Sequence, residues 1–461
     1  MPYQSINPTN LETLEEFPSL SKKEATGKID AAHEAFQSWR TTDYETRKGI
    51  VNEFSNQLKE RESEYAEMIT LEMGKPISQA KEEIGFCAKI AKFYAEGAET
   101  FLADSTVETG DSGEAYLRYD PIGVLMGVMP WNFPFYQVVR FAIPNIMAGN
   151  AILVRHASCV PRCAQAIEKL FHEVGLPSGV YNNLFIPTEF VETIIDDSRI
   201  QGVSLTGSER AGRSVAAAAG RNLRRSVMEL GGNDAFIVLE DADLEKTVEK
   251  AVQGRLTNNG QSCVAAKRFI VHSSLYEDFT AGMKEAFANL KVGDPMNSDT
   301  ELGPLSTEGA AKDLHRKIQT AVRQGAEVVT GGGRPDRPGA FVEPTILTGI
   351  TSENDIFDEE LFGPVACIYR FEDEDQAIEL ANNSSYGLGG SVYTSDIESG
   401  RRVAEKVDTG MLFTNQPTNS SEELPFGGIK NSGYGRELSQ LGILEFVNKK
   451  LIHTLEEFEQ S

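Results

Sequence analysis

The sequence predicts an α/β protein with two strand–helix series and mainly parallel sheets. Residues 22–104 have a helical pattern, with Ala, Leu, Ile and Phe recurring at helical spacing among Glu and Lys. From residue 122 short apolar runs alternate with amphipathic segments, and a second such series begins near residue 231. Strands that alternate with helices are typical of βαβ units, in which neighbouring strands run parallel.

Length and charge narrow the class of protein. The 461 residues suggest two or three domains, and 44 Lys and Arg against 69 Asp and Glu give a net charge of −25. That charge repels phosphate backbones and anionic lipids, so neither nucleic acid nor a membrane is expected as a partner. The N-terminal segment lacks the basic and apolar regions of a signal peptide. Five cysteines without zinc-ligand spacing favour a reducing cytoplasm and no metal site.

Individual elements follow from these patterns. In the first series, strands are expected at 122–129, 151–156, 180–186 and 202–207, with a helix at 161–175. In the second series, strands are expected at 234–240, 267–272, 326–333, 341–347 and 365–371, with helices at 241–259, 275–290 and 373–384. Two extended runs around Gly110–Gly113 predict a hairpin, and the tail from residue 441 fits either a helix or a strand.

Cys263, in NNGQSCVAAKRF, is the first candidate for chemistry. A free cysteine is usually a small buried packing residue. Here polar residues precede it, a Gly-Gln turn places it at an element boundary, and Lys267 and Arg268 follow closely. Nearby cations favour the thiolate, which attacks electrophilic carbon such as a carbonyl.

Glu229 and Asn132 are the next candidates. Glu229 precedes two glycines and an apolar strand, and is either a solvated turn residue or a partly desolvated general base. The two glycines would leave room for a substrate or cofactor to approach the backbone. Asn132 lies in the rigid loop MPWNFPF, where its amide either bonds its own turn or is aimed at a developing oxyanion.

Two segments fit the binding of a phosphorylated ligand, and a third is a loop without a specific motif. Gly207 and Ser208, in VSLTGSERAG, form a strand–turn–helix junction of the kind that binds phosphate, although any such turn favours glycine. Residues 155–158 end a strand, where a ribose or its 2′-phosphate is commonly bound, or where an arginine is simply solvated. Glu360, in DEELFGPV, lies in a loop segment that has no specific motif by itself.

Together these segments closely resemble the aldehyde dehydrogenase superfamily. The similar pieces are PWNFPF, LTGSERAG, ELGGNDAFIV, GQSCVAAKRF, EELFGPV, NSSYGLGGSVYT and PFGGIKNSGYGRE, in the family's order over about residues 20–450. The resemblance implies an atypical Rossmann cofactor domain (1–104 and 122–230), a catalytic α/β domain (231–430) and a small β oligomerisation element (105–121 and 440–461). The tail would then be a strand, and the protein a homodimer or homotetramer.

The resemblance also implies roles for individual residues. Cys263 would be the nucleophile that forms a thiohemiacetal and then a thioester, Asn132 with the Cys263 backbone N–H the oxyanion hole, and Glu229 the base that activates water. The implied cofactor site consists of Trp131, Arg155, His156, Ala157, Ser158, Gly207, Ser208, Leu230, Glu360 and Phe362.

Within the superfamily, the chain is most similar to the shorter bacterial succinate-semialdehyde dehydrogenases. Arg140 matches an arginine that binds the substrate carboxylate, and the pair Ser420–Ser421 matches a serine used in the same way. The alternative for Arg140 is an ordinary salt bridge on a helix. Thr257 stands where some members carry a second arginine, which leaves glutarate semialdehyde and small neutral aldehydes as alternative substrates.

Residues 155–158 also predict the cofactor. Relatives that prefer NAD often have an acid at the fourth of these positions, where it repels a 2′-phosphate. Here that residue is Ser158, and Arg155 and His156 are potential donors. We therefore expect NADP to be preferred and NAD to be usable.

Overall fold

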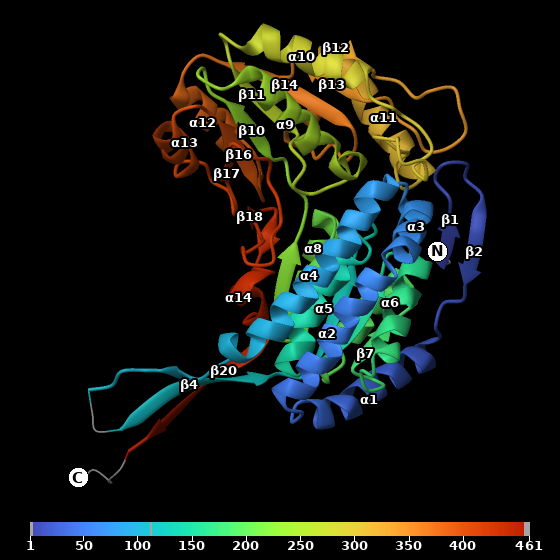
Figure 1. Cartoon of the computed structure of the whole chain (residues 1–461), viewed down its shortest axis with the longest axis vertical. Helices are drawn as coiled ribbons and strands as arrows, with labels where there is room; N and C mark the ends of the chain where they lie inside the picture. The colour runs from blue at the N-terminus through green and yellow to red at the C-terminus, as the bar shows by residue number, and fades with distance from the viewer. Residues whose placement is uncertain (1–2, 111–112, 456–461) are drawn as a thin grey trace.

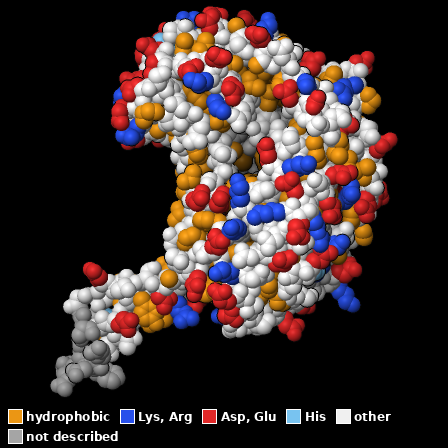
Figure 2. Space-filling model, viewed as in Figure 1, with side chains coloured by type: hydrophobic (Ala, Val, Ile, Leu, Met, Phe, Trp, Pro, Cys, Tyr) orange, Lys and Arg blue, Asp and Glu red, His pale blue; other side chains and the backbone are white. Residues whose placement is uncertain are grey.

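The computed structural model describes residues 3–110 and 113–455 as two lobes and a projecting arm (Figure 1). Each lobe is built around one large sheet, and the arm is formed by a third, small sheet. In the described part of the chain, no helix is long and apolar enough to cross a membrane. Acidic and basic side chains are interspersed over the face shown in Figure 2, which is hollowed between the two lobes.

The chain begins with a hairpin and four helices. The hairpin consists of β1 (Tyr3–Ile6) and β2 (Thr13–Phe17). The helices are α1 (Lys22–Trp39), α2 (Tyr44–Glu60), α3 (Glu62–Met73) and α4 (Ile77–Phe101). Ser21 and Glu24 form a capping box at the start of α1, and Gly74, in a left-handed conformation, ends α3. The helical pattern predicted for 22–104 is thus confirmed as far as Phe101, with breaks at residues 40–43, 61 and 74–76.

The lower lobe contains a six-stranded sheet in the order β19–β9–β8–β5–β6–β7. Its strands are β5 (Val124–Met129), β6 (Ala151–His156), β7 (Tyr181–Asn183), β8 (Ile200–Thr206), β9 (Arg225–Glu229) and β19 (Gly433–Tyr434). All pairs are parallel except β19 with β9. The accompanying helices are α5 (Tyr136–Ala148), α6 (Pro161–Glu173), α7 (Val191–Ile195), α8 (Glu209–Arg221) and α14 (Ser439–Ile443).

The upper lobe contains a seven-stranded sheet in the order β12–β13–β14–β11–β10–β16–β17. Its strands are β10 (Ala235–Val238), β11 (Arg268–His272), β12 (Glu327–Thr330), β13 (Thr345–Thr348), β14 (Val365–Phe371), β16 (Gly390–Tyr393) and β17 (Phe413–Thr414). Only β12 is antiparallel to its neighbour among these described strands. The helices are α9 (Leu244–Leu256), α10 (Tyr276–Ala288), α11 (Glu308–Arg323), α12 (Glu374–Asn382) and α13 (Ile397–Ala404).

The arm is formed by the segment 105–121, for which a hairpin was expected, and by the tail, for which a helix or a strand was expected. Strand β4 (Glu114–Pro121) pairs antiparallel with both β3 (Ser105–Thr106) and β20 (Val447–Thr454). From Val447 the tail is therefore a strand, as the family resemblance implied, whereas its first residues, 441–443, belong to helix α14. Strands β4 and β20 project together from the lower lobe (Figure 1). Asp111 and Ser112 of the predicted hairpin turn, and residues 456–461 of the tail, lie outside the described residues.

Several expected elements are shorter than predicted. The strand expected at 180–186 is limited to Tyr181–Asn183, and the strand expected at 341–347 begins only at Thr345. Pro344 precedes Thr345, and proline cannot donate a hydrogen bond to a sheet. A short pair, β15 (Tyr386–Gly387) with β18 (Ile429–Lys430), lies outside both large sheets.

Candidate active site

Several predicted segments meet because four parallel strands end at one edge of the lower sheet. Strands β5, β6, β8 and β9 are neighbours, and the chain that leaves each of them carries predicted site residues. This edge is where ligands bind in open α/β sheets. A cavity of about 780 Å³ lies there and extends to the upper lobe. The predicted residues that line it are Trp131, Asn132, Gly207, Ser208, Leu230, Cys263, Glu360 and Phe362.

The start of α8 gives this cavity an anion-binding character. Ser208 caps the 13-residue helix, its hydroxyl accepting a bond from the Ala211 N–H at 3.4 Å. Unpaired N–H groups and the helix dipole favour a negative charge at such a position. Four cations also line the cavity, together with as many acidic residues: Arg210, Arg213, Arg316 and Lys317 beside Glu209, Asp355, Glu359 and Glu360. Trp131 and Phe362 contact each other edge to face, with ring centroids 5.7 Å apart.

Residues 155–158 lie outside this cavity, at the end of the neighbouring strand β6. The Arg155 guanidinium donates to the Thr188 hydroxyl at 3.0 Å, and the Ser158 carbonyl accepts from the Gln4 N–H at 3.0 Å. His156 is completely buried and has both ring nitrogens engaged, with Pro134 O at 2.8 Å and Ala157 N at 2.9 Å. Burial lowers the pKa of His156 to about 4. Both ring nitrogens of His156 thus bond within the protein, and the ring holds the loop that carries Asn132. A contact between His156 and a cofactor stays a prediction.

The loop that leads to Cys263, called the nucleophile loop here after the predicted role of that residue, has an unusual backbone. Asn258, Asn259 and Gly260 have φ values of 58°, 57° and 73°, so three consecutive residues are left-handed. Asparagine and glycine tolerate this conformation best. The Asn258 side chain donates to Asn132 O at 2.8 Å, and Asn132 Nδ2 donates to Gln261 O at 3.1 Å. The run Asn-Asn-Gly was the available sequence signal for this turn, which joins the loops of the two lobes.

Cys263 is partly exposed, and it lines both the 780 Å³ cavity at the edge of the lower sheet and a second cavity. Burial raises the pKa of its thiol to about 12, against the opposing effects of Arg140 and Lys267. Arg268, expected to favour the thiolate, donates instead to the carbonyl oxygens of Asn233, Leu380 and Ala381. The two cations that follow Cys263 therefore do not make it a thiolate in this state, because desolvation has the larger effect.

Glu229 ends β9 as a buried carboxylate rather than a solvated turn residue, with 1% of its surface exposed. Burial raises the pKa of Glu229 well above its usual range, and Arg140 opposes that shift. Among the described residues, neither carboxylate oxygen has a hydrogen-bond partner. A Cβ at Gly427 would lie 2.8 Å from Oε1, so the carboxylate occupies space left by that glycine and lies outside both cavities.

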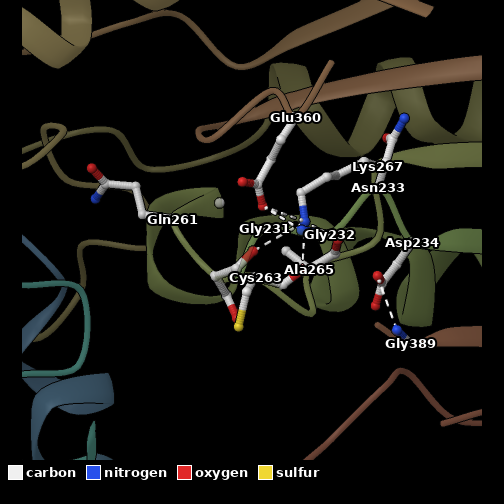
Figure 3. A network of polar contacts seen from close by, with 12 residues as sticks. Gly231, Gly232, Asn233, Asp234, Gln261, Cys263, Ala265, Lys267, Glu360 and Gly389 are labelled. Atoms are coloured by element: carbon white, nitrogen blue, oxygen red, sulfur yellow. Dashed lines mark hydrogen bonds and ion pairs between the residues drawn. The ribbon is translucent and has the colours of Figure 1, made fainter. Parts of the chain in front are cut away.

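The glycines after Glu229 leave room for protein atoms. A Cβ at Gly231 would lie 2.7 Å from Glu360 Oε2, and one at Gly232 would lie 2.6 Å from the Cys263 carbonyl oxygen. The Gly232 N–H donates to Glu360 Oε1 at 3.1 Å. In this structure the space beside the two glycines is occupied by Glu360 and by the Cys263 carbonyl (Figure 3), and the approach of a substrate or cofactor there stays a prediction.

The second cavity, of about 520 Å³, approaches Cys263 from the other side. Tyr136 and Ser420 line it, their hydroxyls 3.1 Å apart, and Thr257 lies on the same lining. Phe133 and Phe426 supply apolar surface, and Lys89 and Lys250 supply positive charge. Ser421, the other serine of the predicted pair, donates its hydroxyl to Glu423 and lies outside this cavity.

Arg140 also lies outside the second cavity, in a buried network. Its Nε forms an ion pair with Glu437, and it donates to the Tyr136 hydroxyl at 3.0 Å and to the Thr206 hydroxyl at 3.2 Å. Burial acts to lower the pKa of Arg140, but Glu437 holds it above the usual value. The guanidinium thus reaches the cavity through Tyr136, which the sequence analysis did not single out.

Comparisons with known proteins agree with this geometry. The model of the aldehyde dehydrogenase family matches residues 1–452. The chain is 49% identical to the succinate-semialdehyde dehydrogenase [NADP(+)] of Deinococcus radiodurans, covering 98% of this chain and 94% of that protein. It is 44% identical to the probable succinate-semialdehyde dehydrogenase [NADP(+)] of Synechocystis, covering 98% and 99%. The crystal structure of succinic semialdehyde dehydrogenase from Streptococcus pyogenes, in complex with NADP+, superposes with a TM-score of 0.96 at 45% identity, covering 98% and 99%. Because the family model spans nearly the whole chain and these relatives are 44–49% identical to it, this chain belongs to the aldehyde dehydrogenase family.

Proposed function

We propose that this enzyme oxidises succinic semialdehyde to succinate, with NADP+ as the preferred cofactor and NAD+ as a usable one. The observation that carries the proposal is the place of Cys263, whose side chain lines both cavities. One cavity has an anion-binding helix start and the other has hydroxyls backed by a buried arginine. The relatives of Deinococcus and Streptococcus carry the same activity and cofactor in their names.

The chemistry of the larger cavity fits a nicotinamide dinucleotide phosphate. The start of α8 and the surrounding cations suit the phosphates, Glu360 suits ribose hydroxyls, and Trp131 and Phe362 offer aromatic faces. Gly207, Ser208 and Leu230 complete this part of the proposed site. Arg155, Ala157 and Ser158 are proposed for the adenosine end, where the absence of an acid admits a 2′-phosphate. When bound, the nicotinamide ring supplies the hydride acceptor.

The protein's own residues have three tasks in the proposed mechanism. The Cys263 thiol loses its proton and its sulfur adds to the aldehyde carbon, forming a thiohemiacetal. Asn132 Nδ2 and the Cys263 N–H donate to the developing oxyanion. Loss of hydride leaves a thioester on Cys263. Glu229 then takes a proton from water, and this water attacks the thioester and releases succinate and the free thiol. Because the Glu229 carboxylate is buried outside both cavities, its side chain must first turn toward Cys263. In total, aldehyde, water and NADP+ give carboxylate, NADPH and two protons.

The substrate carboxylate is assigned to the Tyr136 and Ser420 hydroxyls. Arg140 donates to Tyr136, so the hydroxyl that faces the cavity is polarised by a buried cation. Lys89 and Lys250 belong to the same lining, together with Glu82 and Glu83. The alternative is a broader aldehyde dehydrogenase for glutarate semialdehyde or small neutral aldehydes, which is favoured by the Arg140–Glu437 pair and by Thr257. We further propose a cytoplasmic homodimer or homotetramer, with the projecting arm as the oligomerisation element.

The test is NADPH formation with succinic semialdehyde beside butanal, a neutral aldehyde of equal length. We expect a kcat/KM at least tenfold larger for the semialdehyde, because about 1.4 kcal/mol from one charge-assisted hydrogen bond corresponds to that factor. Cys263→Ala should abolish turnover with both aldehydes. Equal rates, or a preference for butanal, would contradict the proposed substrate while leaving the aldehyde dehydrogenase chemistry in place.

A further inference from the structure

The Lys267 ammonium contacts both the loop that carries Cys263 and the carboxylate of Glu360. Its Nζ donates to the carbonyl oxygens of Ser262 at 3.2 Å, Cys263 at 2.7 Å and Ala265 at 3.0 Å. The same ammonium forms an ion pair with Glu360 Oε1 at 3.4 Å, and the side chain is 2% exposed. Figure 3 shows this group between the nucleophile loop and Glu360.

The backbone of Lys267 is held in place by two hydrogen bonds. Its N–H donates to Asp234 O at 3.1 Å and its carbonyl accepts from the Cys367 N–H at 3.0 Å, immediately before β11 in the upper sheet. The ammonium has three hydrogens and four partners, so its bonds to the loop and its attraction to Glu360 compete. A change at Glu360 therefore changes how firmly the loop is held.

From this arrangement we infer that Lys267 is a positioning residue, which couples occupation of the cofactor cavity to the reactivity of the Cys263 thiol through Glu360. The inference rests on the proposed function in taking Glu360 as a residue that binds the cofactor. Ligand hydroxyls that bond the Glu360 carboxylate would share its negative charge. The Lys267 ammonium would then be less neutralised, and its charge, held on the Cys263 carbonyl, would favour the thiolate.

A purely structural role makes a different prediction. Lys267 would then only satisfy three carbonyl oxygens of a buried turn, as buried polar groups require. Removing it would lower stability, but the response of the thiol to the cofactor would be kept. Arg268 offers the matched control, because it is also a buried cation bonded to three carbonyl oxygens, none of them in the nucleophile loop.

The experiment is alkylation of the full-length enzyme by iodoacetamide, with and without saturating NADP+ and without aldehyde. Modification is followed by mass spectrometry of the peptide that contains Cys263, since Cys159 is also partly exposed. The reagent can reach the thiol through the second cavity, which Cys263 also lines. Binding of NADP+ is measured separately by quenching of tryptophan fluorescence.

In the wild-type enzyme, NADP+ should accelerate alkylation at least about fivefold, the lower end of ordinary coupling between sites. In Lys267→Met the ratio should fall to within about twofold of unity while NADP+ still binds, and Arg268→Met should keep the wild-type ratio. Lys267→Gln keeps donors for the loop and replaces the methionine variant if that one does not fold. A wild-type rate that does not respond to bound NADP+, or an unchanged ratio in the Lys267 variants, would overturn the inference. Failure to oxidise the semialdehyde with the ratio intact would count against the proposed function alone.

Discussion

Arg140 and Glu437 form an ion pair inside the protein, with 0% and 7% of their side chains exposed. The Glu437 carboxylate also accepts a hydrogen bond from the Ser204 hydroxyl at 3.2 Å. The Arg140 guanidinium lies over the Phe426 ring, with its Cζ 4.4 Å from the ring centroid. The arginine assigned to substrate binding is therefore first of all a partner of Glu437.

Arg140→Met should destabilise the protein strongly, because it leaves Glu437 buried without its cation. Breaking one side of a buried pair typically costs about 3–5 kcal/mol. Replacing both partners, as in Arg140→Met with Glu437→Leu, should recover most of that loss, since no charge then remains buried. Urea unfolding of the two variants measures the difference. A double variant no more stable than Arg140→Met would show that packing around Phe426, and not the pair, is responsible.

Tyr136→Phe should separate substrate binding from stability. The change removes the hydroxyl that joins Arg140 to Ser420 and keeps the ring. We expect kcat/KM for succinic semialdehyde to fall roughly tenfold, the value of a hydrogen bond to a charged group. The kcat/KM for butanal should change little. Steady-state kinetics with both aldehydes provides the check, and an equal loss for both would assign Tyr136 to the shape of the cavity.

Thr257→Arg should strengthen the preference for a carboxylate-bearing aldehyde. Thr257 is exposed, lines the second cavity, and uses its hydroxyl only on the Gln253 carbonyl among the described residues, at 2.8 Å. An added cation there should lower KM for succinic semialdehyde by up to about fivefold, as partly exposed charge pairs allow. Thr257→Glu is the control of opposite charge and should raise the same KM. No difference between the two variants would place the substrate carboxylate elsewhere.

His156 should make the protein sensitive to acid. Its pKa is about 4 in the folded protein against 6.5 for the free side chain, because burial disfavours the charged ring. The unfolded chain binds the proton first, so stability is complete above 6.5 and is lost as pH falls toward 4. Between about pH 7.5 and 5.5 the free energy of unfolding should fall by about 1 kcal/mol because of His156.

His156→Gln should remove that part of the pH dependence. Unfolding midpoints in urea at the two pH values give the comparison, and His172→Gln, at an exposed position of α6, is the control. An identical pH dependence in His156→Gln and the wild type would mean that other groups cause the loss of stability in acid.

The sequence could predict the elements that depend on local pattern and the residues that follow parallel strands. Trp131, Gly207 and Leu230 meet because β5, β8 and β9 are adjacent and parallel, so their carboxyl ends share one edge. Residues 308–323 carried no prediction, although Ala311, Leu314 and Ile318 of α11 have helical spacing. That helix contributes Lys317 to the larger cavity.

The partners of the charged and polar side chains were decided only by the tertiary structure. Arg140 pairs with a residue almost 300 positions away, His156 turns into the core to hold Pro134, and Lys267 binds a loop and Glu360 together. A sequence shows which side chains are able to ionise or donate. Desolvation and distance determine what each of them does, and both are fixed only when segments remote in the chain are packed against one another.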